Sequence, residues 1–220
     1  MTVTHHPAEA LLLDYASGAL PEPMALLVAT HAALCPACRA DIARFERAAG
    51  ALIDAAAPDA DDMLPAELKE AIMARLDEPE PELPANAPAN PETAFLPEPL
   101  RGYAGKAVAR GDWKRWGRGV RQIRLLEGRG DATVRLARIR GGARMPEHTH
   151  SGDEATLVLA GGYSDVSGHY LRGDVSEQGV EDVHQPVADA GGDCICLIVS
   201  TAPLRLKGLA GAVINPFIRD

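Results

Sequence analysis

The stretch ATHAALCPACRADI places three potential metal ligands, His31, Cys35 and Cys38, within eight residues. This H-x3-C-x2-C spacing lets two thiolates and one imidazole approach a single tetrahedral Zn2+ ion, because the histidine stands one helical turn before the first cysteine. The alternative is a helix end with two ordinary core cysteines and a surface histidine. The spacing favours the zinc site, and such a site constrains how the surrounding helices can pack.

A fourth ligand has to come from elsewhere, and His5 and His6 are the nearest candidates. They precede Pro7, which is expected to be the first residue of a helix. Only one of two adjacent side chains readily points at a given ion, and the one beside the rigid proline is better positioned. We therefore expect His6 to be the ligand and His5 to be exposed to solvent, with His5 as the alternative.

The first 76 residues contain four segments with helical apolar periodicity. Pro7, Pro23 and Pro36 are each expected to start a helix, and a shorter fourth helix is expected at about residues 66–76. These alanine-rich helices would form only a thin core. Binding of the metal is therefore expected to supply a large part of the folding free energy of this region.

Residues 77–99 are expected to form a linker. They contain seven prolines and six acidic residues but no basic residue. Such a composition buries little apolar surface, and its prolines favour an extended spacer.

The remaining residues, 100–220, contain short alternating apolar runs separated by glycine, which predict a β sandwich or small barrel. The expected fold class is therefore α+β multidomain, with a zinc-bound four-helix domain (residues 1–76), the linker and a β domain. Cys194 and Cys196 alternate on one expected strand. We interpret them as small core residues, with a redox pair as the alternative.

A second group of potential ligands lies in this β region. His148 and His150 are two residues apart, so both rings project from one face of a strand, and Glu154 follows four residues later. With the glycines at positions 142 and 161, the segment has the pattern G-x5-H-x-H-x3-E-x6-G. This pattern resembles the first motif of the cupin barrels.

A second cupin motif is matched from Gly173 to His184, whose histidine would complete the site. Gly179 stands where that motif has proline and Glu181 where it has glycine, but His184 stays in register. Three imidazoles and a carboxylate can hold Zn, Fe, Mn, Ni or Cu, and zinc is our first choice. The alternative is a barrel that binds no metal. His169 lies outside both motifs and is expected to be an ordinary strand residue.

Charge and composition restrict the class of partner. The net charge is -9 and aromatic residues make up 4% of the chain, which argues against contact with phosphate backbones or stacked bases. Residues 1–99 hold 17 acidic and 5 basic side chains (net -12), whereas residues 100–220 hold 14 and 17 (net +3). An acidic first half suits a basic protein partner, although it also suits a merely soluble surface.

No apolar run approaches the roughly 20 residues needed to span a bilayer. The N-terminus MTVTHHPAEA also lacks the regions of a signal peptide. We therefore expect a cytoplasmic protein without a membrane partner.

The order of the two motifs carries a more specific resemblance. A helical H-x3-C-x2-C module with an upstream histidine, joined by a linker to a cupin, resembles the ChrR-type zinc-binding anti-sigma factors. The resemblance rests on THHPAEALLLDYASGAL, VATHAALCPAC, HTHSGDEATLVLAGGYSD and DCICLIVSTAPLRLKG, and it spans nearly the whole chain.

This resemblance implies that the N-terminal helices bind an extracytoplasmic-function sigma factor as a 1:1 heterodimer. Binding would block access of the sigma factor to RNA polymerase and promoter DNA, without catalysis. The cupin domain would sense oxidative stress, including singlet oxygen, and trigger release. The implied metal ligands are His6, His31, Cys35 and Cys38 for Zn2+ in the helical domain, and His148, His150, Glu154 and His184 for the cupin ion.

The main alternative is a metal-dependent cupin enzyme, such as a dioxygenase or isomerase, with a zinc-binding appendage. Cupin folds host both roles, so the fold cannot decide between them. A zinc-finger-like DNA binder is a third possibility, but it conflicts with the acidic N-terminal half.

Overall fold

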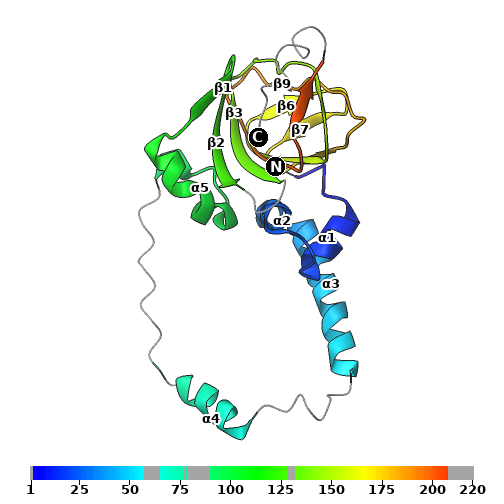
Figure 1. Ribbon diagram of the computed structural model, residues 1–220, viewed down its shortest axis with the longest axis vertical. Helices are drawn as coiled ribbons and strands as arrows, with labels where there is room; N and C mark the ends of the chain where they lie inside the picture. Colours follow the sequence, from blue (N-terminus) through cyan, green and yellow to red (C-terminus); the bar gives the residue numbers. More distant parts are fainter. Residues whose placement is uncertain (1, 57–64, 77, 79–89, 128–131, 208–220) are drawn as a thin grey trace.

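The computed structural model describes residues 2–56, 65–76, 78, 90–127 and 132–207. Figure 1 shows a β domain at one end of the molecule, with α1, α2 and α3 leading away from it and α4 set apart. The fifth helix, α5, lies beside the strands β1 and β2.

The N-terminal region is helical, as predicted. Its four helices are α1 (Glu9–Ala16), α2 (Glu22–Leu34), α3 (Pro36–Ala55) and α4 (Ala66–Arg75). Between α2 and α3 the backbone of Cys35 is extended (φ -113°, ψ 103°). The reason is that the residue before a proline is pushed out of the helical conformation, and Pro36 follows directly. The chain therefore turns sharply at Cys35.

Part of the expected linker is folded. A 3-10 turn, η2 (Pro91–Thr93), precedes α5 (Glu98–Arg110), which ends at Gly111 in the left-handed conformation (φ +71°). Leu96 is 1% exposed and belongs to the main core. Residues 90–99 were expected to bury too little apolar surface to fold, but Leu96 is part of this core. Helix α5, which begins at Glu98, was missed by the sequence analysis. Residues 79–89 lie outside the described residues.

Eleven strands are present among the described residues of the β domain. They are β1 (Lys114–Gly117), β2 (Val120–Glu127), β3 (Thr133–Ile139), β4 (His148–His150), β5 (Glu154–Ala160), β6 (Gly162–Ser164), β7 (His169–Leu171), β8 (Val175–Gln178), β9 (Val187–Ala188), β10 (Cys194–Ser200) and β11 (Leu204–Leu206). They form a six-stranded sheet in the order β1-β2-β3-β10-β5-β8, a three-stranded sheet β7-β6-β9 and the pair β11-β4. The pairings between these strands are antiparallel, as expected for a small β barrel or sandwich.

Alternation along the central strands divides the six-stranded sheet into two faces. On β3, Val134 and Leu136 belong to a core shared with α2 and α5, whereas Ile139 belongs to a second core inside the β domain. Helix α2 contributes Leu26 and Leu27 to the shared core. Burying a leucine fully is worth about 1.5–3 kcal/mol, so these contacts join the helices firmly to the sheet.

The second core contains Cys194 and Cys196, which are buried as predicted. Their sulfur atoms lie 3.5 Å apart as free thiols. A hydrogen bond with Cys194, together with burial, raises the pKa of Cys196 well above its usual value. In this arrangement the Cys196 thiol stays protonated.

Among the described residues, no single helix is long and apolar enough to cross a membrane. Only α2 and α3 taken together pass that test, as a pair bent by 119°.

Candidate metal centres

Four of the expected ligands come together where α1, α2 and α3 meet. His6 precedes α1, His31 lies in the last turn of α2, and Cys35 and Cys38 lie at the start of α3. Each offers one donor atom, and these atoms all lie within 4.8 Å of one another. The sharp turn at Cys35 makes this possible, because it brings the first turn of α3 back toward the end of α2.

The distances between donor atoms suit a tetrahedral ion. His6 Nδ1 lies 3.4 Å from Cys35 Sγ and 3.3 Å from Cys38 Sγ. With Zn–S and Zn–N bonds of about 2.3 and 2.0–2.1 Å, neighbouring ligand atoms of a tetrahedral zinc site are roughly 3.4–3.8 Å apart. The four residues therefore fit Zn2+.

His31 is oriented by the β domain. Its ring is fully buried, and Nδ1 lies 2.9 Å from the carbonyl oxygen of Gly173. Because a carbonyl can only accept, Nδ1 carries the proton and donates it. This leaves Nε2 as an acceptor, and that buried atom has no hydrogen-bond partner in the described part of the chain. Burial also lowers the pKa of His31 to about 4, which keeps the ring in the neutral form that binds metals.

The cysteines are held in an environment that a cation would stabilise. Burial, together with the neighbouring Cys35, raises the pKa of the Cys38 thiol to about 12. A thiolate is therefore disfavoured here without a positive charge nearby, and a bound Zn2+ supplies that charge. The free Nε2 of His31 and the two neighbouring thiols would therefore both be stabilised by a bound metal cation.

His5 is not part of this group. Its Nδ1 lies 3.5 Å from Asp174 Oδ2, and its ring packs on Tyr170 with 4.6 Å between the ring centroids. The sequence analysis expected His5 to be exposed, but its side chain is only 38% exposed because it packs against the β domain. His6 is the more exposed of the two residues.

The segment that carries His6 is bonded to the turn before β8. Asp174 Oδ1 accepts hydrogen bonds from the backbone N–H groups of Thr4 (2.7 Å) and His5 (2.9 Å). The carbonyl of His5 in turn accepts from the N–H of Val175 (3.0 Å). Both histidines of the N-terminal group are therefore held through the turn at residues 173–175 of the β domain.

The second group lies inside the β domain. His148, His150 and His184 are buried, and their potential donor atoms converge. His184 Nε2 lies 3.0 Å from His148 Nε2 and 3.2 Å from His150 Nε2. Three Nε2 atoms this close cannot all be satisfied by hydrogen bonds to one another, because a nitrogen that carries no proton can only accept. A shared cation would satisfy all three.

Two of these rings have partners that fix their orientation. His148 Nδ1 lies 2.8 Å from the carbonyl of Pro146, and His184 Nδ1 lies 2.9 Å from Asp165 Oδ2. Such outer partners are typical of metal-binding histidines. Burial lowers the pKa of His148 to about 4 and also lowers the pKa of His150. These shifts favour neutral imidazoles at His148 and His150, and the Nε2 atoms of all three rings face one another.

Glu154 lies beside this group but is engaged elsewhere. Its Oε2 accepts hydrogen bonds from Arg135 (3.1 Å) and Ser200 (2.9 Å). The same oxygen lies 3.7 Å from His150 Nδ1, which has no hydrogen-bond partner among the described residues. The structure therefore brings together three of the four residues expected at the second site and holds the fourth in an adjacent ion pair.

The sequence analysis missed several residues that support these sites. Asp165 orients His184, Arg135 and Ser200 hold Glu154, and Asp174 anchors the N-terminal segment. Asp165 follows the first cupin motif, and Asp174 lies within the second. Neither motif contains Arg135 or Ser200. A charged residue at an inward position of an expected strand, as Arg135 is, was the one available signal.

The protein thus combines a helical thiolate–imidazole site with a β domain that carries three clustered histidines. Residues 104–204 match a sequence model described as the ChrR cupin-like domain. The chain is 39% identical over 219 residues to the anti-sigma-E factor ChrR of Cereibacter sphaeroides, covering 100% of both chains.

Solved structures give the same result. A crystal structure of Rhodobacter sphaeroides SigE in complex with the anti-sigma ChrR has a TM-score of 0.76 and 38% identity, covering 90% of this chain and 99% of that chain. An RmlC-like cupin from Ralstonia eutropha is far more distant, with a TM-score of 0.40 and 20% identity over 45% of this chain and 68% of that chain. This chain belongs to the ChrR family of anti-sigma factors.

Proposed function

We propose that this protein is an anti-sigma factor that sequesters an extracytoplasmic-function sigma factor from RNA polymerase and promoter DNA. The relative that it resembles along its full length is an anti-sigma factor, and the similar crystal structure holds that relative with SigE. This relationship carries the proposal. The family is one of regulators, which sets aside the alternative of a cupin enzyme. Sequestering a transcription subunit also implies a cytoplasmic location.

The surface of the helical region supports this function. Leu68 and Ile72 on α4 and Leu76 at its C-terminal cap recur every four residues, so they lie on one face, and all three are exposed. Near the end of α3, Leu52 and Ile53 are 74% and 73% exposed. Clusters of exposed large apolar side chains are typical of surfaces that bind another protein.

These apolar side chains lie where a partner can reach them. Figure 1 shows that the end of α3 and the whole of α4 lie away from the β domain. The net charge of -12 in residues 1–99 adds long-range attraction to a basic partner. Apolar contacts would supply most of the affinity, and the acidic charge would speed association and keep DNA away.

Capture of the cognate sigma factor by the full-length protein tests this proposal. The double variant Leu68→Glu/Ile72→Glu should weaken the 1:1 complex about 100-fold or more, because it places charges in the centre of the apolar surface. The matched control is Glu70→Gln on the same exposed helix, which should bind as the unchanged protein does. Equal binding by all three proteins would contradict the proposed surface. The full chain is needed because α2 shares its core with the sheet.

For the N-terminal group, we propose that His6, His31, Cys35 and Cys38 hold one structural Zn2+. The donor distances, the free Nε2 of His31 and the two buried thiols support this assignment. The ion would lock the starts of α1 and α3 to the end of α2 and so preserve the binding arrangement of the helices. Metal analysis should find this ion in the full-length protein and lose it in a Cys35→Ser/Cys38→Ser variant.

For the β domain, we propose that His148, His150 and His184, with Glu154 as the fourth ligand, hold a second divalent ion, with Zn2+ as first choice. We also propose that this domain is the sensing part, and that oxidative stress such as singlet oxygen alters this site and lowers the affinity for the sigma factor. The turn at residues 173–175 supports a route for this effect, because it bonds to Thr4 and His5, which precede His6, and to the ring of His31.

A His148→Ala/His150→Ala variant separates sensing from binding. It should still capture the sigma factor, because both residues lie on β4 in the β domain and the proposed binding surface lies on α3 and α4, but it should no longer release it on exposure to singlet oxygen. A matched control is His169→Ala, which alters an exposed histidine of the same domain outside the group. Normal induced release by the double variant would remove the second ion from the mechanism.

A further inference from the structure

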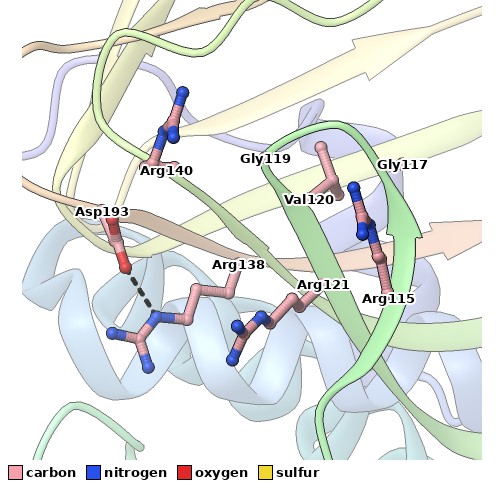
Figure 2. A pocket seen from close by; sticks show the side chains of 8 residues that line it. All are labelled: Arg115, Gly117, Gly119, Val120, Arg121, Arg138, Arg140 and Asp193. Atoms are coloured by element: carbon pink, nitrogen blue, oxygen red, sulfur yellow. Dashed lines mark hydrogen bonds and ion pairs between the residues drawn. The ribbon is translucent and has the colours of Figure 1, made fainter.

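Four arginines line a cavity of about 430 Å3 on the surface of the β domain, away from both metal groups. They are Arg115 on β1, Arg121 on β2, Arg138 on β3 and Arg140 just after β3. Figure 2 shows Arg140 and Arg115 in the upper part of the view, on the left and on the right, with Arg138 and Arg121 below them. The remaining lining residues are Gly117, Gly119, Val120 and Asp193.

The strand register forces three of these positive charges into a row. Arg115 is the register partner of Arg121, and Arg121 is the register partner of Arg138. Register partners on adjacent antiparallel strands point to the same face, and like charges placed directly opposite each other destabilise a sheet. The fold therefore bears a repulsion here that neutral side chains would avoid.

One carboxylate lines the cavity, and it is already engaged. Asp193 Oδ2 accepts from Arg138 Nε at 2.7 Å, and its Oδ1 accepts from the backbone N–H of Gly141 at 3.3 Å. No ion pair within the described ranges joins Arg115, Arg121 or Arg140 to an acidic side chain. The cavity thus keeps an excess of three positive charges.

The three arginine side chains of this row are not part of the hydrophobic core. Two residues further along each strand and on the same face, Ile123 and Leu136 are buried in the core shared with the helices. Arg121 is exposed, so the helical cover ends between these two positions of β2. The arginines therefore lie on the same face of the sheet as the core residues, at the point where the helices no longer cover it.

We propose that this cavity binds a small, multiply charged anion of the phosphate class. Guanidinium groups match phosphate oxygens with two parallel hydrogen bonds, and several of them around one hollow favour a ligand with more than one negative charge. The volume lies within the range of about 300–1,000 Å3 that is usual for small-molecule sites. The glycines at positions 117 and 119 add no side chains that would fill the hollow.

Calorimetric titration of the full-length protein with inorganic pyrophosphate, at constant ionic strength, tests the proposal. The unchanged protein should bind one pyrophosphate saturably. Arg121→Gln and Arg115→Gln should each weaken binding about tenfold or more, because each removes a charge-assisted hydrogen-bond donor. Arg118→Gln is the matched control, since it removes an equal charge from the same hairpin outside the lining and should change affinity less than about twofold.

Thermal unfolding provides a readout that a structural role would not give. Without ligand, Arg121→Gln should melt at a higher temperature than the unchanged protein, because it relieves the repulsion. Pyrophosphate should raise the melting temperature of the unchanged protein, and the same concentration should raise that of Arg121→Gln by much less. Absence of saturable binding, or equal weakening by Arg118→Gln, overturns the proposal. Loss of sigma-factor capture by Arg121→Gln without any pyrophosphate binding also overturns it and assigns the face to a protein interface.

Discussion

The two groups of potential metal ligands are supported in different ways. The group in the β domain takes its ligands and their orienting partners from that domain alone, with Pro146 and Asp165 holding two of the rings. The N-terminal group collects ligands from separate helical segments, and His31 is oriented by the carbonyl of Gly173 in the β domain. A change in the β domain can therefore reach the N-terminal group directly. The three histidines of the β domain, here called the inner group, have no hydrogen bond to the helices among the described residues.

The largest effect is expected from the Cys35→Ser/Cys38→Ser variant. Loss of a structural zinc removes a binding free energy of about 10 kcal/mol or more from the helical region, so the helices should lose their arrangement and sigma-factor capture should disappear. Circular dichroism and a capture assay check this. A metal ion bound by His148, His150 and His184 should remain, because these residues and their orienting partners all lie in the β domain. Undiminished capture without the N-terminal ion would contradict the proposal that this ion preserves the binding arrangement of the helices.

Leu27→Ala tests whether the helices and the β domain form one cooperative unit. Leu27 is fully buried in the core shared by α2 and the sheet, so the free energy of unfolding should fall by about 3 kcal/mol. Urea unfolding followed by helical and by tryptophan signals should still give one transition. Two separate transitions would show that the helices and the β domain unfold independently. A change in the β domain would then not be expected to reach the N-terminal group. Leu13→Ala, at a half-exposed position, is the control.

Asp174→Ala should weaken the N-terminal group without removing any ligand. It leaves the N–H groups of Thr4, His5 and Leu171 without their acceptor, which should cost about 2 kcal/mol of stability and reduce zinc affinity at that site. Competition with a chelator measures the zinc affinity of each site. Glu177→Gln, which alters an exposed acceptor for Ala8, should have little effect. An equal loss of the inner metal would contradict the asymmetry.

The smallest effect is a pH dependence of the same contact. Burial acts to raise the pKa of Asp174, but backbone hydrogen bonds from Leu171, His5 and Thr4 outweigh it and lower the pKa below the ordinary value of 3.8. The ionised carboxylate therefore stabilises the fold at every pH above 3.8, and this contribution is lost as the pH falls through the lowered value. The stability difference between the unchanged protein and Asp174→Asn should be constant from pH 5 to 7 and shrink only in strong acid.

Features set by neighbouring residues were predictable from the sequence. The H-x3-C-x2-C spacing, the prolines at helix starts and the alternation on β3 and β10 fix local geometry, because three to eight consecutive residues determine them. The preference for His6 over His5 also came from a neighbour, Pro7. The helices α1–α4 and the main strands were accordingly found from the sequence.

Only the tertiary structure decided which distant residues meet. Helix α5 begins at the end of the proline-rich, acidic stretch and continues into the region that the sequence predicted to be β. Just before it, Leu96 is buried in the core shared with the sheet in spite of the composition of that stretch. The bond from His31 to Gly173, the ion pair of Arg135 with Glu154 and the row of arginines join residues from separate elements. Strand register and the packing of α2 on the sheet set these contacts, and both are fixed by burial of the whole core, which no local spacing encodes.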